Sequence, residues 1–285
     1  MRRPASPSEA NNLPNPTPPF STGEYQRRLR AVRASMAEQK MDLLFCQDPS
    51  NMAWLTGYDG WSFYVHQGVL VFLDEPPEWW GRAQDANGAV RTVWMDDACV
   101  NSYPDHYVQS STLHPMQHLG DLIRERGYGV KRIGVELDNY YFSAKACRAL
   151  EERLPDARLV DATGLVNWQR TIKSGEELAF MRKAARISEK IIDGIAERVE
   201  PGLLKHELVA EIYADAIRGI DADWGDYPAI VPLLPSGTNA AAPHLTWNSD
   251  PFRTGEATFF EISGCYRRYH APLCRTVFLG KPPQH

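Results

Sequence analysis

The stretches PSGTNAAAPH, residues 235–244, and FFEISGCYRRYHAPLCRT, residues 259–276, carry the strongest indications of how this chain folds. The first is made largely of Pro, Gly, Asn and Ala, which predicts a loop, and it ends on His244. Functional side chains concentrate in such loops. The second opens like a buried strand, in which Glu261 follows two phenylalanines. Because an unpaired buried carboxylate is costly, Glu261 requires a cationic partner.

Two kinds of partner for Glu261 remain open. One is an arginine of the chain itself, namely Arg267, Arg268 or Arg275. The other is a ligand with a planar amidinium or guanidinium group, whose two parallel N–H donors match the two oxygens of a carboxylate. His244 also has two interpretations. It can be an ordinary surface or core histidine, or it can take a proton from water and return it to a departing nitrogen.

Two long helices are expected before these stretches and short strands around them. An apolar stripe at helical spacing predicts a helix over residues 175–198, and a second helix is expected over residues 205–218 after Pro201 and Gly202. Strands are expected over residues 229–233, 257–262 and 276–279. Helices followed by antiparallel strands indicate an α+β domain.

The first half of the chain alternates between strands and helices, which indicates an α/β domain over residues 23–170. Its strands are expected at residues 42–46, 68–74, 91–95 and 132–137, and its helices at residues 21–39, 116–126 and 143–153. Residues 1–22 are rich in Pro, Asn and Ser, so we expect a flexible arm there.

Composition excludes several classes of function. The chain has 285 residues, 43% of them hydrophobic and 24% charged, with a net charge of −5 and a pI near 5.9. No basic field would draw it to nucleic acid or to an anionic membrane, and the apolar runs are too short to span a bilayer. The five cysteines show neither a disulfide framework nor metal-ligand spacing. We expect a cytoplasmic protein.

Together with the opening stretches, two further segments resemble the creatinase and proline-peptidase family. DPSNMAWLTGYDG, residues 48–60, is similar to the N-terminal signature of that family, and IKSGEELAFMRKAARISEKIIDG, residues 172–194, to its linker helix. The resemblance implies an α/β creatinase-like N-terminal domain followed by an α+β pita-bread domain over residues 171–285. Family members continue beyond the equivalent of residue 285. We therefore expect this pita-bread domain to be incomplete and the sequence to be an N-terminal portion or a truncated product.

The resemblance also bears on metal ions. The metallopeptidases of the family carry aspartates at the positions of Glu261 and Pro272, and proline has no donor atom for a metal. Their Ser-Asp-x-Thr-Arg-Thr pattern reads Ala-Pro-Leu-Cys-Arg-Thr here, from Ala271 to Thr276. Creatine hydrolase, which is metal-free, has a substrate-binding glutamate where Cys274 stands. We expect no metal, no cofactor and a Cys274 thiol that is buried and structural, since no oriented base for it is visible.

Two clusters of aromatic and polar residues are candidate substrate-binding sites. Trp61 and Tyr64 lie in one of them, and Trp224, Asp226 and Tyr227 in the other. Aromatic faces attract delocalised cations, although ordinary core packing is the alternative for each ring. In creatine hydrolase the N-terminal loop reaches into the neighbouring subunit, so the resemblance implies a homodimer with shared pockets.

Within the family the chain looks most similar to ectoine hydrolases. This resemblance rests on the combination of three segments, PSGTNAAAPHLTW, FFEISGCYRRYHAPLCRT and DWGDYPAI. This similarity implies a metal-independent hydrolase of a C–N bond in a small cyclic amidine osmolyte, namely ectoine or 5-hydroxyectoine. His244 and Glu261 would be catalytic, and Tyr269 would join the residues of the two aromatic clusters in binding substrate. A metal-dependent Xaa-Pro dipeptidase and a catalytically inactive binding module remain as alternatives.

Overall fold

The computed structural model describes residues 18–282, and the chain divides into two units, residues 1–172 and 173–285. Most of the Pro-rich segment expected to be a flexible arm lies outside the described residues. Its described end is packed, because Phe20 is buried and Ser21 caps the first helix by accepting the Glu24 N–H. Among the described residues, no helix combines the length and the apolar character that a membrane crossing requires.

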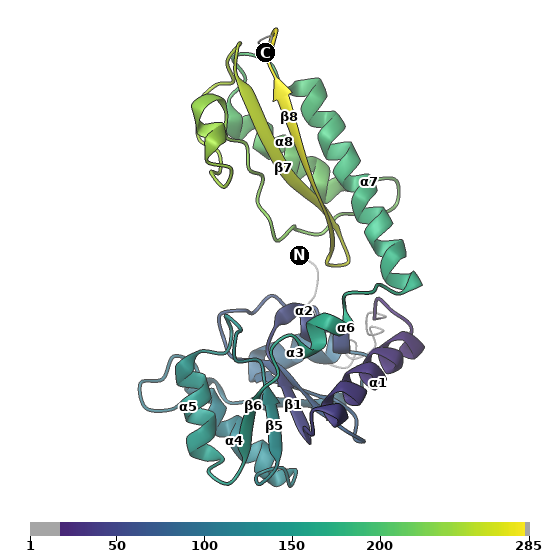
Figure 1. The fold of residues 1–285 in the computed structure, drawn as a ribbon, viewed down its shortest axis with the longest axis vertical. Helices are drawn as coiled ribbons and strands as arrows, with labels where there is room; N and C mark the ends of the chain where they lie inside the picture. The colour runs from purple at the N-terminus through teal and green to yellow at the C-terminus, as the bar shows by residue number, and fades with distance from the viewer. Residues whose placement is uncertain (1–17, 283–285) are drawn as a thin grey trace, which may run out of the picture. The chain divides into compact units, whose positions relative to one another are not determined.

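Unit 1 contains a six-stranded mixed sheet in the order β4-β3-β2-β1-β5-β6 (Figure 1). β1 pairs antiparallel with β2 and parallel with β5, so a parallel half and a largely antiparallel half meet at the centre of the sheet. The strands are β1 (Leu43–Cys46), β2 (Gly68–Phe72), β3 (Glu78–Arg82), β4 (Val100–Tyr103), β5 (Arg132–Val135) and β6 (Arg158–Asp161). The helices are α1 (Thr22–Glu38), α2 (Pro49–Thr56), α3 (Ala83–Thr92), α4 (Pro115–Glu125), α5 (Ala144–Arg153) and α6 (Leu165–Gln169).

Both faces of this sheet are covered by helices, which explains why β1 is apolar at every position. Leu44 and Cys46 point into a core shared with α1, α2, α3 and α6. Leu43 and Phe45 point into a second core shared with α4 and α5, which lie side by side in Figure 1. A strand buried on both faces has a continuous hydrophobic sequence instead of an alternating one.

The strand expected at residues 91–95 is wrong. Residues 91 and 92 end helix α3, and residues 93–95 form a connection with a bend at 94 and 95, in which Val93 and Met95 are buried without a partner strand. The sheet positions are taken instead by β3 and β4, which the sequence did not reveal. A short apolar run such as residues 93–95 therefore does not by itself distinguish a strand from a buried connection.

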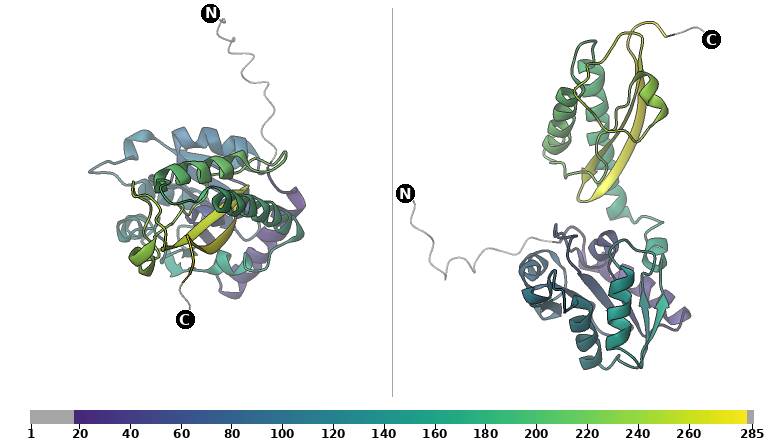
Figure 2. Two further views of the ribbon diagram at one scale, coloured as in Figure 1. Left: turned by 90° about the horizontal axis from the view of Figure 1, so that it is seen from above. Right: turned by 90° about the vertical axis from the view of Figure 1, so that its left-hand side faces the viewer.

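Unit 2 packs a long two-stranded hairpin against two helices, as the two directions of view in Figures 1 and 2 show. Its elements are α7 (Gly175–Arg198), α8 (Lys205–Arg218), the 3₁₀-helix η4 (Gly237–Ala241), β7 (Ala257–Tyr266) and β8 (Tyr269–Phe278). Ser174 and Glu177 form a capping box that starts α7. The apolar stripes of α7 and α8 meet Phe260 and Ile262 of β7 in one core.

The strand expected at residues 229–233 is also wrong. Pro232 interrupts the segment, Pro228 and Pro235 flank it, and a proline cannot donate to a sheet ladder. Pairing is limited to two isolated bridges, Leu233 with Glu261 and Ser236 with Thr258. These bridges anchor the start of the loop that leads to His244 along the side of β7 that β8 does not occupy.

Candidate active site on the β7–β8 hairpin

The two faces of the hairpin differ in chemistry. Phe260 and Ile262 face the core, so Glu261 between them projects from the opposite face. Glu261 is directly opposite Cys274 in the register. Its backbone N–H and C=O both bond to Leu233, at 3.0 Å each, so Glu261 and Cys274 form a pair without mutual backbone hydrogen bonds. In such pairs the Cα atoms are about 4.5 Å apart and the side chains lie close together.

Pro272 lies on the same face as Glu261, opposite Ser263. Hydrogen-bonded and non-hydrogen-bonded pairs alternate along the two strands, and Pro272 belongs to a non-hydrogen-bonded pair. Its nitrogen therefore points away from β7, and the missing N–H does not interrupt the hairpin. The position that carries a second carboxylate in the metallopeptidases is therefore an ordinary strand position whose side chain has no donor atom.

The described residues on this face of the hairpin do not by themselves form a metal centre. In the described part of the chain no group of three or more His, Cys, Asp or Glu side chains is placed to hold a metal ion. The cross-strand neighbours of Glu261 on its face of the hairpin are Cys274, directly opposite, and Pro272 and Thr276 on the two diagonals, and Ser263 lies two residues further along β7. Hard divalent ions require several oxygen ligands, and one carboxylate beside a proline does not supply them.

Glu261 is half-buried, and within residues 18–282 it forms no ion pair. The three arginines considered as its partners are engaged elsewhere. Arg267 and Arg268 stack on aromatic rings, and Arg275 donates to the carbonyl of Cys274 at 2.7 Å. The structure therefore does not provide the internal salt bridge, and the carboxylate is available to an external cation.

His244 lies in an exposed turn shortly after η4. It makes no hydrogen bond or ion pair with any described residue, Glu261 included. Its loop is nevertheless fixed at its start, because the Ser236 and Thr258 hydroxyls lie 2.7 Å apart in a buried contact beside β7.

Cys274 is exposed, which corrects the expectation of a buried structural thiol. The residue belongs to β8, whose core-facing positions are the alternate residues such as Leu273. Cysteine is usually buried, but here the alternation of the strand places it on the face of Glu261.

Trp224, Asp226 and Tyr227 gather at the tip of the hairpin. The guanidinium of Arg267 lies 5.2 Å from the centre of the Trp224 ring, and that of Arg268 lies 4.1 Å from the Tyr227 ring. Asp226 accepts the Arg268 N–H at 3.0 Å. The sequence predicted that these three residues act together. In the structure the two rings have cationic partners from the chain itself, and Asp226 accepts a backbone N–H.

Tyr269 is the first residue of β8, and its hydroxyl donates to Glu177 at 2.8 Å. Its ring also packs edge-on against Phe180, at 5.9 Å between centroids. Tyr269 therefore links the start of β8 to the first turns of α7.

Trp61 and Tyr64 belong to unit 1, whereas His244 and Glu261 belong to unit 2. Both aromatic side chains are strongly exposed, at 69% and 65% of their full area, so neither is a core residue. They lie in the long connection between α2 and β2.

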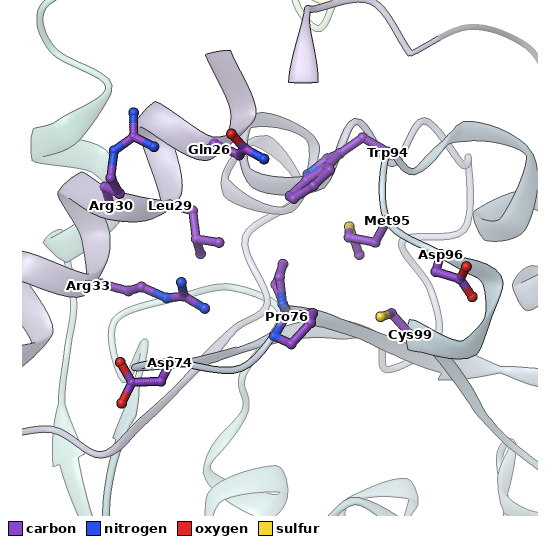
Figure 3. Close-up of a pocket in the computed structure, with 11 residues that line it drawn as sticks. Gln26, Leu29, Arg30, Arg33, Asp74, Pro76, Trp94, Met95, Asp96 and Cys99 are labelled. Atoms are coloured by element: carbon purple, nitrogen blue, oxygen red, sulfur yellow. The ribbon is translucent and has the colours of Figure 1, made fainter. Parts of the chain in front are cut away.

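Unit 1 contains a pocket of about 490 Å³ (Figure 3). Arg30 and Arg33 of α1 border it on one side, and Trp94, Met95 and Cys99 border it on the other. None of the residues predicted to bind substrate lines it.

Sequence reasoning missed His270, which lies beside the Trp224–Tyr227 segment. Its Nε2 accepts the backbone N–H of Ala229 at 2.9 Å, and burial lowers its pKa below the ordinary value for histidine. The residue stood inside one of the two opening stretches, but no spacing distinguished it from the other histidines.

Two family models match the chain. The Creatinase/Prolidase N-terminal domain matches residues 28–172, and Metallopeptidase family M24 matches residues 179–285. Ectoine hydrolase from Halomonas elongata is 55% identical over 271 residues, covering 93% of this chain and 68% of that protein. Creatinase from Bacillus sp. is 22% identical, covering 92% of this chain and 62% of that protein.

Solved structures show the same fold. Prolidase from Thermococcus sibiricus superposes with a TM-score of 0.77 at 18% identity, covering 92% of this chain and 68% of that one. Xaa-Pro dipeptidase from Bacillus anthracis gives 0.72 at 17% identity, with 91% and 66% covered. The chain thus spans about two thirds of the length of the relatives that it matches.

Proposed function

This chain belongs to the family of creatinases, prolidases and M24 metallopeptidases, and from that premise we propose that it is a metal-independent hydrolase that opens the ring of ectoine or 5-hydroxyectoine. The observation that carries the proposal is the face of the hairpin around Glu261. It offers one carboxylate that forms no ion pair with any residue from 18 to 282, next to Pro272 at the position where a metallopeptidase needs a second carboxylate. The 55% identity to an ectoine hydrolase supports the substrate class.

The chemistry follows from the substrate. Ectoine contains a delocalised N–C–N cation and a carboxylate, and the cation can donate two N–H groups to a carboxylate such as Glu261. When Glu261 holds the cation, binding orients its central carbon for attack by water. If Glu261 instead attacks this carbon, a C–O bond forms as the ring C–N bond breaks, and water then attacks the same carbon and displaces the carboxylate. The oxygen of water adds to this carbon and one ring C–N bond breaks. His244 takes the proton from water and delivers it to the departing nitrogen, which gives N-acetyl-2,4-diaminobutyrate.

Metal independence rests on donor chemistry. A metal that activates water is held by several oxygen or nitrogen donors, and the described cross-strand neighbours of Glu261 are a thiol, a hydroxyl and a proline. The low identity to prolidases, 17% and 18%, shows the fold alone and gives no support for peptide substrates.

The proposal includes a homodimer in the cytoplasm. The exposure of Trp61 and Tyr64 supports the idea that the connection carrying them contributes an aromatic wall to the site of a second copy. Trp224, Asp226, Tyr227 and Tyr269 are proposed to shape the substrate pocket from within unit 2, in addition to their contacts at the hairpin tip.

Proton NMR of ectoine mixed with the purified chain tests this function. We expect the ring signals to be replaced by those of the acetylated diamine. Replacing Glu261→Gln keeps the shape of the side chain and removes its charge, so turnover should fall at least about 100-fold. Glu197→Gln, an exposed change on α7, serves as the matched control and should retain turnover.

Two results would contradict the proposal. If Glu261→Gln retained full turnover, the role of the carboxylate would be wrong. If the unchanged chain were folded by circular dichroism but left ectoine intact, this polypeptide would not be the proposed hydrolase. Hydrolysis of an Xaa-Pro dipeptide upon addition of a divalent metal would then favour the peptidase alternative.

A further inference from the structure

Three hydrogen bonds attach residues 226–229 to the tip of the β7–β8 hairpin. The Asp226 N–H donates to the Cys265 carbonyl at 2.9 Å, and the Asp226 carboxylate accepts the Arg268 N–H at 3.0 Å. The third bond runs from the Ala229 N–H to Nε2 of His270, at 2.9 Å. A side chain that titrates near neutral pH therefore closes one end of this attachment.

The attached segment also contacts a hairpin turn whose two residues have an unfavourable backbone conformation. Arg267 and Arg268 form the two-residue connection of the hairpin with φ values of 49° and 66°. This is the left-handed region that hairpin turns usually fill with Asn or Gly. The rings of Trp224 and Tyr227 lie against the two guanidinium groups. The segment and the tip thus hold each other in place.

The hydrogen bonds fix the protonation state of His270. Nε2 accepts a hydrogen bond, so it must carry a lone pair. Nδ1 lies 3.1 Å from the Arg268 carbonyl, which can only accept, so Nδ1 carries the proton. A second proton on Nε2 would place two donors, Nε2–H and the Ala229 N–H, face to face at 2.9 Å, and this bond would be lost.

The groups that face His270 come from three parts of unit 2: Cys265 from β7, Arg268 from the turn and Asp226 from the attached segment. The Cys265 sulfur lies 3.8 Å from Nδ1. Burial lowers the pKa of His270 and the charge of Arg268 adds to this, whereas the Arg268 carbonyl and Asp226 oppose it. The net direction is downward, so the neutral form that the geometry requires is the form present at neutral pH.

We propose that His270 is a positioning residue whose neutral Nδ1–H form holds the segment bearing Trp224, Asp226 and Tyr227 on the hairpin tip, and whose doubly protonated form releases the Ala229 end of that segment. We call the hydrogen bond from the Ala229 N–H to neutral His270 the latch. The latch rests on the hydrogen bonds given above. Its effect on substrate binding rests on the proposed function, in which this segment shapes the pocket.

Amide hydrogen exchange at Ala229, measured as a function of pH and corrected for intrinsic exchange, tests the latch without any substrate. Protection should fall by up to about tenfold per pH unit once the pH is below the pKa of His270, because the neutral fraction falls in that proportion. In His270→Gln the side-chain oxygen can accept the Ala229 N–H but does not titrate, so protection should persist. In His270→Leu protection should be low at every pH. Thermal unfolding of each variant verifies that it is folded.

A long-range ¹H–¹⁵N spectrum of the histidine side chains identifies the tautomer directly, with His270→Gln assigning the signal. Protonation at Nδ1 supports the latch. Protonation at Nε2, or a loss of Ala229 protection in His270→Gln over the same pH range as in the unchanged chain, would overturn it. When the chain opens ectoine, its KM should rise at acid pH and that of His270→Gln should not. If the KM of the unchanged chain and that of His270→Gln changed with pH in the same way, the latch would have no effect on substrate binding. Whether the chain opens ectoine would not be affected by that result.

Discussion

Glu24 stabilises the start of unit 1 through two arginines. Its carboxylate accepts hydrogen bonds from Arg27 and from Arg28, each at 2.8 Å, and the Arg28 guanidinium is buried under the ring of Phe20 at 4.0 Å. Burial alone would raise the pKa of Glu24, but the two arginines outweigh it and lower the pKa to about 2. The charged form is therefore favoured in the folded state.

Replacing Glu24→Gln should lower the free energy of unfolding by about 2 kcal/mol at pH 7, since it leaves Arg28 buried without its counter-charge. The folded-state pKa is depressed, so the charge of Glu24 contributes above the unfolded-state pKa and loses its contribution as the pH falls from about 4.5 towards 2. Urea unfolding at several pH values measures this. The exposed change Glu38→Gln on the same helix is the control, and a difference independent of pH would contradict the assignment.

At the residue scale, local sequence patterns predicted that Glu261 lies on a strand, but they did not predict the contacts of the other candidate residues. The apolar run that ends in Phe259 and Phe260 was sufficient to place Glu261 on a strand, since this pattern is local. The partners of Trp224 and Tyr227 could not be predicted, because Arg267 and Arg268 follow about forty residues later and meet these rings only through the fold. Cys274 was assigned to the core from residue type, whereas the strand alternation determines its face.

At the scale of elements, the approach of α7 to the hairpin depends on Gly264. A Cβ atom at this position would lie 2.4 Å from the Ala184 carbonyl oxygen and 2.7 Å from the Ser188 nitrogen, both of them backbone atoms of α7. The Ser188 hydroxyl bridges the two strands by accepting the Gly264 N–H and donating to the Ala271 carbonyl. Helix and hairpin are therefore in direct backbone contact.

Replacing Gly264→Ala should destabilise unit 2 by about 2 kcal/mol, because α7 would have to move away from β7. Gly175→Ala is the matched control, since a Cβ there meets no atom within 4 Å, and its effect should stay within about 0.5 kcal/mol. Chemical unfolding monitored by circular dichroism measures both. Equal stability of the two variants would show that the close approach is not required.

Helices were easier to predict than strands for a physical reason. α7 and α8 follow from apolar positions at helical spacing within one segment, and their observed limits match the expected ones. A strand needs a partner, and neither residues 91–95 nor residues 229–233 have one along their length. β3 and β4 were missed because they pair with each other in parallel at one edge of the sheet. The sequence of either segment alone contains no pattern that reveals this pairing.

At the scale of the whole molecule, each unit has a hydrophobic core of its own. Two clusters enclose the sheet of unit 1, and the third lies within unit 2. We expect residues 1–172 produced alone to fold, since their cores are complete without residues of unit 2. Cooperative urea unfolding with mixed α/β circular dichroism would support this. A non-cooperative transition would show that unit 1 depends on unit 2.

The central claim is hydrolysis of a cyclic amidine without a metal. Proton NMR of ectoine with the purified chain in excess chelator, combined with elemental analysis of the same sample, tests it most directly. We predict ring opening at the same rate with and without chelator, in a sample with far less than one metal ion per chain. Loss of turnover on chelation, restored by adding a divalent metal, would contradict the claim and show that Pro272 does not prevent metal catalysis.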